Sequence, residues 1–197
     1  MIGRWIAFAT LAFAAACAGG TQQTAAVTPA GPCEPVARMP VAGRASPYDS
    51  TLATVGTGQL KVCYGRPSAR GRAIFGELVP LDTLWRTGAN EPTILHLSAP
   101  AEVAGVRLEP GTYSLYTVPG RDEWTVVLNR STSQWGHESQ YTAPVRAQEI
   151  ARARVPAART DSFVETFTIR TEPAADATLH LVLEWENTRV RIPVRAV

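Results

Sequence analysis

The sequence predicts an all-β protein: a single antiparallel β-sandwich domain of jelly-roll-like form that follows a signal peptide and a flexible tether. Three observations lead to this expectation. The first sixteen residues are mostly apolar, the next stretch is rich in Ala, Gly, Thr and Pro, and the rest carries short alternating segments separated by turn residues. We divide the chain into residues 1–16 (signal peptide), 17–45 (tether) and 46–197 (β-domain). The last part has the size of one ordinary domain, about 150 residues.

The β-domain contains eight segments with the strand pattern. They are Gln59–Tyr64, Thr93–Ser98, Ala101–Val106, Thr112–Val118, Trp124–Asn129, Phe163–Arg170, Ala177–Glu186 and Arg189–Val194. In the first segment Leu60, Val62 and Tyr64 fall on one face, which predicts that this face lies in the core. The turn residues Pro119-Gly120 predict a hairpin between the fourth and fifth segments, and Asn187-Thr188 predicts one between the last two.

Residues 143–155 fit two structures. Their Ala, Gln, Glu and Arg residues favour an amphipathic helix. Residues 150–155 also alternate in the manner of a strand, with small side chains and Val on one face. We expect a strand over 150–155.

The N-terminus has the layout of a secretory signal. Arg4 is followed by twelve uncharged residues, Trp5–Ala16, whose helix would be about 18 Å long and too short for a hydrocarbon core of about 30 Å. A charged start, a short apolar middle and small residues at the end are typical of a signal peptide, so we expect export to the periplasm.

The segment Ala14-Ala15-Ala16-Cys17 resembles a bacterial lipobox, although Ala14 stands where Leu is usual. The resemblance implies a lipid on Cys17 that attaches the protein to a membrane, and the alternative is ordinary cleavage near Ala16. Ala18 stands where lipoproteins retained in the inner membrane carry Asp, which implies sorting to the outer membrane. The composition of residues 17–45 is that of a flexible tether.

The net charge and the cysteine content restrict which ligands and cofactors the protein is expected to bind. The net charge of +2 gives no electrostatic case for nucleic acid binding. Cys33 and Cys63 can form a disulfide in an oxidising compartment, or remain two free thiols. No Cys-His spacing suits zinc and no phosphate-binding glycine loop is present, so we expect neither a metal nor a cofactor. Nothing in the pattern indicates an oligomeric state.

The stretch Pro67–Glu91 lacks a strand pattern, and structureless loops of this length are often functional. Its arginines suit carboxylate or phosphate groups, and its aromatic side chains beside Arg, Asn and Glu would suit a sugar or a small anionic ligand. The alternative is structural, because the loop must satisfy its own backbone polar groups. The candidate ligand-binding residues are Tyr64, Arg66, Arg70, Arg72, Trp85, Arg86, Asn90, Glu91 and Trp135.

Two functional hypotheses remain open. The chain lacks a Gly-x-Ser-x-Gly nucleophile motif, and its three histidines are isolated, so we assign no catalytic residue. This favours a non-catalytic binding or scaffolding lipoprotein of the cell envelope. The alternative is a periplasmic hydrolase that uses Glu91 with Arg66 or Arg86 in a cleft formed by residues 64–91.

Several motifs of the β-domain resemble one protein family. They are Tyr64-Gly-Arg-Pro67, Gly71-Arg72, Ile74-Phe-Gly76, Leu78-Val-Pro80, Trp85-Arg-Thr-Gly-Ala-Asn-Glu91, Gly111-Thr-Tyr-Ser-Leu115, Glu123-Trp-Thr125 and Gln134-Trp-Gly136. Together they are similar to the domain-of-unknown-function family 2911 of bacterial envelopes, over about residues 46–197. Gly65 stands where Ser is usual and Pro92 where Ala is usual. The resemblance implies a β-sandwich-like domain of unassigned activity.

Overall fold

The computed structural model describes residues 30–35 and 40–197. The predicted signal peptide and Cys17 lie outside the described residues. The elements are β1 (Tyr48–Val55), β2 (Gly58–Gly65), β3 (Thr93–Leu97), β4 (Ala101–Val103), β5 (Val106–Leu108), β6 (Gly111–Val118), β7 (Glu123–Asn129), a 3-10 turn at Glu138–Gln140, α1 (Ala143–Arg146), β8 (Glu149–Pro173) and β9 (Thr178–Ala196). In this described part of the chain, no helix is long and apolar enough to cross a bilayer.

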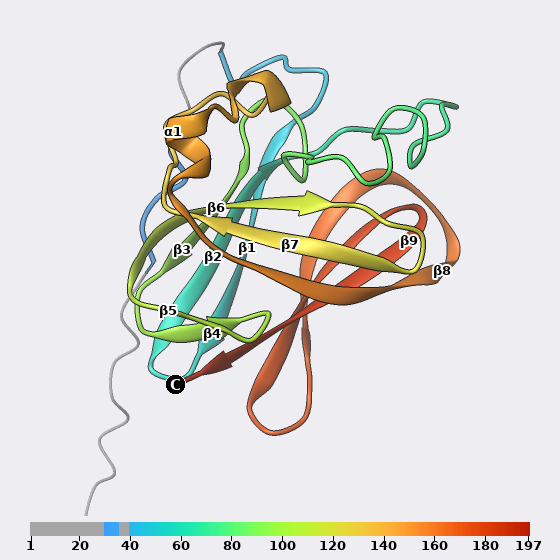
Figure 1. Ribbon diagram of the computed structural model, residues 1–197. Coiled ribbons are helices and arrows are strands. Elements are labelled where there is room, and N and C mark those ends of the chain that lie inside the picture. Colours follow the sequence, from blue (N-terminus) through green and yellow to red (C-terminus); the bar gives the residue numbers. More distant parts are fainter. Residues whose placement is uncertain (1–29, 36–39) are drawn as a thin grey trace, which may run out of the picture.

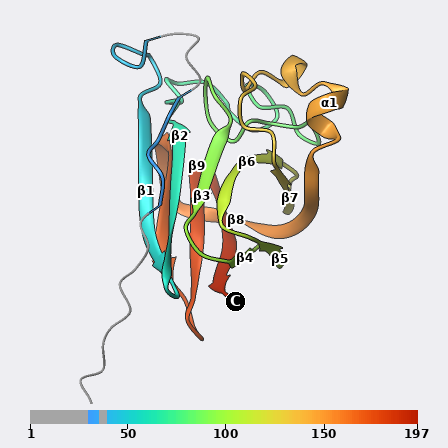
Figure 2. The same ribbon diagram turned by 90° about the vertical axis from the view of Figure 1, so that its left-hand side faces the viewer.

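The strands form one open, antiparallel sheet in the order β1-β2-β3-β6-β7-β8-β9-β4-β5 (Figure 1). The long strand β8 folds this sheet over. Residues 149–156 of β8 pair with β7, and residues 157–173 pair with β9. The register shifts twice between residues 159 and 168, and such irregularities bend a strand. In Figure 2, β8 curves beneath β6 and β7 from the side of α1. The prediction of an all-β, antiparallel sandwich is confirmed.

The core lies between the two halves of the folded sheet. Leu60, Val62 and Tyr64 of β2 are buried, as their alternation predicts. The alternating apolar residues of β9 face them, with Leu181 and Leu183 buried. At one end of the core, five aromatic side chains pack with ring centroids 5.0–6.2 Å apart: Phe75, Trp85, Trp124, Phe167 and Trp185. Contacts of this kind stabilise a fold by about 0.5–1.5 kcal/mol per pair beyond area burial.

Two strand predictions are wrong. Ala101–Val106 is not one strand but contains a turn between β4 and β5, where Ala104 has φ 51° and Gly105 has φ 79°. Two left-handed residues in succession close a tight hairpin. The apolar residues around them resemble a continuous strand, so the sequence pattern does not indicate the turn. The hairpin at Asn187-Thr188 does not form either. β9 continues through these residues, because β8 is long enough to pair with both of its halves.

Three further elements differ from the pattern. The sequence does not predict β1, because its residues do not alternate between apolar and polar. The outward face of this edge strand carries Ser50, Leu52 and Thr54, and the apolar Leu52 is exposed. The strand expected over 150–155 is confirmed, but it continues without a break into the segment at 163–170, and both belong to one strand, β8. Residues 143–155 contain both of the structures considered for them. The single helical turn α1 comes first, and β8 begins at Glu149.

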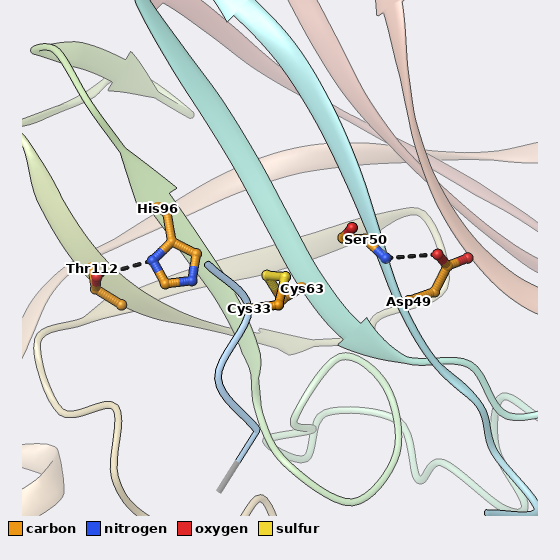
Figure 3. The surroundings of a disulfide bond; sticks show 6 residues. All are labelled: Cys33, Asp49, Ser50, Cys63, His96 and Thr112. Atoms are coloured by element: carbon orange, nitrogen blue, oxygen red, sulfur yellow. Dashed lines mark hydrogen bonds between the residues drawn. A yellow bond between two sulfur atoms is a disulfide. The ribbon is translucent and has the colours of Figure 1, made fainter. Parts of the chain in front are cut away.

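Part of the predicted tether is held against the sheet. We call residues 30–35 the strap. The backbone N–H of Ala30 donates to Oε1 of Gln59 at 3.0 Å, and a disulfide joins Cys33 to Cys63 of β2 with a Cα–Cα distance of 5.8 Å (Figure 3). The strap and the outer face of β3 and β6 enclose a cavity of about 490 Å³ that is lined by Gly31 and His96, among others. The β-domain therefore holds the chain upstream of residue 46.

The strap changes the environment of His96. Its Nδ1 lies 3.0 Å from the Thr112 hydroxyl, and its Nε2 is buried with no hydrogen-bond partner in the described chain. Burial lowers the pKa of His96 below the usual 6.5, and the positive charge of Lys61 lowers it further, while Glu34 of the strap raises it. Burial and Lys61 outweigh Glu34, so the folded protein favours the neutral imidazole.

The first prediction concerns the disulfide. Replacing both cysteines (Cys33→Ser/Cys63→Ser) should lower the free energy of unfolding by about 3–4 kcal/mol, because the bridge closes a loop of about 30 residues in the unfolded chain. Urea denaturation of the mature protein, with and without a thiol reductant, measures this loss. Ser50→Ala is the matched control, since Ser50 is the cross-strand neighbour of Cys63. Equal stability of the oxidised wild type and the double variant would contradict the prediction.

The second prediction concerns pH. A folded-state pKa below 6.5 means that His96 does not destabilise the fold above that pH. Stability falls as the pH drops and the half-buried ring must take up a proton. In NMR titrations the pKa of His96 should lie below 6.5 in the wild type. It should rise toward 6.5 in Cys33→Ser/Cys63→Ser, where the released strap exposes the ring. Identical titration of His96 in the two proteins would show that the strap does not cover it in solution.

Candidate functional site

The loop between β2 and β3, residues 66–92, crosses one end of the sandwich (Figure 1, upper part). The residues of this loop line most of a pocket of about 460 Å³. Its wall combines apolar side chains with a smaller polar set. The lining residues are Ser46, Pro67, Arg72, Leu78, Val79, Pro80, Thr83, Leu84, Trp85, Arg86, Gly88, Ala89, Asn90, Glu138 and Trp185. The loop supplies most of them, β9 supplies Trp185, and the turn before α1 supplies Glu138.

The inner end of the pocket is aromatic and rigid. Trp85 and Trp185 are stacked, with ring centroids 6.0 Å apart and an angle of 19° between the ring planes. The backbone of Trp85 also pairs with Thr117 of β6, with N···O distances of 2.7 and 2.9 Å. This pairing fixes the indole position before any ligand arrives, which reduces the entropy that binding would cost.

The polar edge of the pocket consists of Arg86, Glu138 and Asn90. Nη1 of Arg86 donates to Oε1 of Glu138 at 3.2 Å. A side-chain carbon at Gly136 would lie 2.6 Å from Cδ of Arg86, so only glycine lets this segment lie so close to the arginine stem. Nε of Arg86 is buried without a partner in the described chain. The carbonyl oxygen of Asn90 accepts from the N–H of Gly136 at 3.1 Å, and its side chain is half-buried at the pocket wall.

Contacts with the strands β2, β3 and β6 hold the segment 85–91 in a tight turn. Thr87 and Asn90 adopt left-handed φ angles of 57° and 68°. The Thr87 hydroxyl lies 3.0 Å from that of Thr117, and the Thr93 hydroxyl donates to the Thr87 carbonyl at 2.6 Å. The Ala89 carbonyl packs so closely on β2 that a side chain at Gly65 would overlap it. Tight hydrogen bonding and close packing hold one wall of the pocket in place.

Glu91 does not face the pocket. Both of its carboxylate oxygens accept from Arg44, at 2.8 and 2.9 Å, and the two side chains are 1% and 2% exposed. The Tyr48 hydroxyl is buried nearby. Burial, and the negative charge of Glu91, raise the pKa of Tyr48 to about 12, and Arg44 lowers it in part. Glu91 therefore fastens the chain before β1 to the loop.

The remaining arginines of the loop bond mainly to the protein itself. Arg66 donates to the Phe167 carbonyl, to Asp49 at 2.9 Å and to the Thr168 hydroxyl. Arg70 donates to the Ala45 carbonyl at 2.9 Å.

Arg72 is exposed, and its Nε and Nη2 donate to the carbonyls of Ala69 and Ser68 at 2.9 and 2.8 Å. Tyr64 is buried, and its hydroxyl bonds to the backbone of Ile169 in β8. Burial raises the pKa of Tyr64. These contacts fit the interpretation in which polar side chains of the loop satisfy backbone groups of the protein rather than bind a ligand.

The structure thus divides the candidate site residues into two groups. Arg72, Trp85, Arg86 and Asn90 line the pocket. Tyr64, Arg66, Arg70, Glu91 and Trp135 are not among its lining residues, and Trp135 is half-buried in the segment before the 3-10 turn.

Sequence reasoning missed two important pocket residues. Trp185 ends the apolar run of β9, a pattern that predicts burial but not a pocket. Glu138 lies in a polar stretch with no distinctive spacing. Within the described residues, no group of three or more His, Cys, Asp or Glu side chains could hold a metal ion.

A family model for proteins of unknown function, DUF2911, matches residues 46–194. The chain belongs to the DUF2911 family. No curated protein and no solved structure matches it. All pocket residues lie inside the DUF2911 region, whereas Arg44 and Cys33, which attach the upstream chain to the domain, lie before it.

The third prediction concerns the Arg44–Glu91 pair. Arg44→Met should lower the free energy of unfolding by about 3–5 kcal/mol, because it leaves a buried carboxylate without its partner. The double variant Arg44→Met/Glu91→Leu should recover most of this loss, since an apolar pair of similar volume needs no charge compensation.

Urea denaturation measures both variants. The matched control is Arg195→Met, which breaks the exposed pair of Arg195 with Glu102 and should cost far less. A loss for Arg44→Met no greater than that for Arg195→Met would contradict the burial argument.

Proposed function

We propose that this DUF2911 protein is an exported, lipid-anchored envelope protein whose β-domain binds a small, hydroxyl-rich ligand such as a sugar, without catalysis. The observation that carries the proposal is the pocket in the loop. It combines two stacked indoles, an apolar wall and a polar edge of Arg86, Glu138 and Asn90. A concave, mostly apolar site with a few convergent polar groups is the usual form of a small-molecule site.

The charges at the pocket favour a neutral ligand over an anion. The guanidinium of Arg86 is already paired with Glu138. Arg72 uses two of its nitrogens on backbone carbonyls. An anion would compete with Glu138 for Arg86, whereas sugar hydroxyls can donate to the carboxylate and accept from the guanidinium. Apolar sugar faces would pack against the exposed side chain of Leu78 and the half-buried Leu84 of the pocket wall, because the two indoles beneath them are almost completely buried.

The pocket chemistry supports binding rather than hydrolysis. Both oxygens of Glu91 are occupied by Arg44, so the base named in the hydrolase alternative is held away from the pocket. Glu138 is then the one carboxylate among the lining residues. Hydrolysis of a glycosidic bond generally requires a pair of carboxyl groups on opposite sides of the bond. Binding needs only the arrangement that the lining residues already form.

The disulfide supports the envelope location. Bridges such as Cys33–Cys63 form and persist in oxidising compartments, and the bacterial periplasm is one of them. The N-terminal signal and the lipobox-like Ala14-Ala15-Ala16-Cys17 support export and a lipid on Cys17. Ala18 supports outer-membrane sorting.

The fourth prediction tests the ligand. Envelope saccharides and small anions are screened against the purified mature protein by thermal shift, and stabilising compounds are measured by calorimetry. We expect a saccharide to bind. Glu138→Gln and Asn90→Gly should each weaken its binding about tenfold or more, the consequence of one lost or unsatisfied hydrogen bond. Glycine at 90 removes the amide and tolerates the left-handed φ of 68°.

The matched control is Glu109→Gln, which alters an exposed carboxylate outside the pocket lining. Its saccharide affinity should equal that of the wild type. Binding of an anion that Glu138→Gln strengthens would overturn the choice of a neutral ligand. Turnover of a saccharide would establish the hydrolase alternative. Stabilisation by none of the compounds would contradict the binding proposal.

A further inference from the structure

A second pocket, of about 380 Å³, lies where the turn between β6 and β7 meets β8 and β9 (Figure 1, right-hand side). Its polar lining consists of Arg121, Asp122, Arg159, Glu186, Asn187 and Thr188. It shares no lining residue with the pocket of the proposed function, which we call the first pocket. The two pockets are therefore separate sites, and a ligand of one need not resemble a ligand of the other.

The inward-facing rows of β8 and β9 end in polar side chains at the second pocket. On β8 the row of the buried Val155 continues through Ala157, which packs against the core, and ends in Arg159. On β9 the row of the buried Val190 ends in Thr188, the cross-strand neighbour of Arg159. Arginine and threonine thus stand where the alternation would place apolar side chains, and they give this rim of the sandwich a polar surface.

A break in the ladder between β8 and β9 borders the second pocket. Between the pairs Arg159–Thr188 and Val164–Glu186, a longer stretch of β8 faces only Asn187 of β9. Glu186 adopts a left-handed φ of 55°, which is strained for a residue with a side chain. Bulges and strained residues are frequent beside ligand sites, where they redirect side chains. Here the irregular residues of β9 all line the pocket.

The polar side chains of the second pocket have hydrogen-bonding capacity that the protein does not use. Within the described residues, the side chains of Arg121, Asp122 and Arg159 make no hydrogen bond and no ion pair. Glu186 uses one carboxylate oxygen, which accepts from the N–H of Ile74 at 3.3 Å. These groups line a concave surface, so they are available to a ligand.

Charged neighbours outside the pocket are paired. Arg154 of β8 forms an ion pair with Glu123 at 3.3 Å. Arg189 of β9 forms ion pairs with Glu184 and with Asp161. None of these five residues lines the second pocket. The unused charges are therefore a property of the pocket and not of charged side chains in this region of the sheet.

The second pocket holds both signs of charge apart from each other. Arg121 and Arg159 are positive and Asp122 and Glu186 are negative, yet in the described part of the chain neither arginine forms an ion pair with either acid. The acids would repel a simple anion, and the arginines would repel a simple cation. A guanidinium matches a carboxylate, and a carboxylate attracts an ammonium group. A ligand that carries both groups can satisfy both halves of the pocket at once.

We propose that the second pocket binds a small zwitterion with a carboxylate and an ammonium group, which is an amino acid or a short peptide. Arg121 and Arg159 bind the carboxylate. Asp122 and the second oxygen of Glu186 bind the ammonium group. The amide of Asn187 offers a donor and an acceptor to a peptide group between them. The proposal is independent of the ligand of the first pocket.

The fifth prediction tests this site by NMR titration of the purified mature protein with the common amino acids and with dipeptides. Binding should shift the backbone amide signals of Arg121, Arg159 and Asn187. Acetylation of the ammonium group or amidation of the carboxylate should weaken binding of the tightest compound about tenfold or more, because each removes one charged contact. Comparison of the amino acids with the dipeptides shows which of the two is the ligand.

Arg159→Gln should weaken binding of the tightest compound about tenfold or more. It should leave the Tm unchanged, because this side chain has no partner in the described chain to lose. It should have little effect on the amidated compound, which has no carboxylate. The matched control is Arg154→Gln, which alters an exposed arginine of the same strand outside the pocket and should keep the wild-type affinity. If Arg159→Gln does not fold, the blocked compounds test the same charges on the wild type.

The proposal is overturned if no compound shifts these amide signals, or if blocked and unblocked forms bind equally. Binding that Arg159→Gln leaves unchanged would also overturn it. Failure of a saccharide to bind the first pocket is a separate result, because the signals come from residues 121, 159 and 187, none of which lines that pocket. Amide shifts that require both charged groups of the compound support the second site.

Discussion

The packing of Trp85 against the aromatic core is the interaction on which the upper half of the molecule depends. The loop 66–92 has isolated bridges but no strand of its own. Trp85 joins it to the sheet twice, through backbone pairing with Thr117 and through its ring contacts with Phe167 and Trp185. Loop segments on either side, including Phe75, pack around this point. Trp85 therefore fixes the loop at the inner end of the pocket.

The structural role of this loop does not compete with the binding role proposed for it. Arg66, Arg70 and Arg72 donate to backbone carbonyls, and Glu91 forms a buried pair with Arg44. These contacts satisfy the hydrogen-bonding capacity of polar groups that a long loop would otherwise leave without partners. Because they hold the loop in shape, Arg86, Asn90 and the indoles can form a preorganised surface. Among the described residues, Nε of Arg86 finds no hydrogen-bond partner, and this is the cost of placing an arginine at such a wall.

The sequence predicts the strands well where alternation involves large apolar residues, as at Leu60 and Val62 or at Leu181 and Leu183. It fails where pairing with a distant partner decides the structure. Nothing local distinguishes the continuous β9 from a hairpin at Asn187-Thr188, because the deciding fact is that β8 runs for 25 residues. In the candidate site, too, local sequence pattern is informative and distant contacts are not predicted. Composition indicates the loop, but whether Glu91 faces a ligand depends on Arg44, which lies in a segment that composition assigns to the tether.

The bridge between Cys33 and Cys63 has a consequence for proteolysis of the chain. Residues 40–43, between the strap and Arg44, are exposed. Cleavage there would not shed the domain, because Cys33 would remain covalently joined to Cys63 and would keep the upstream fragment attached. After a cut in this segment the two fragments would stay joined, and separating them would require reduction of the disulfide.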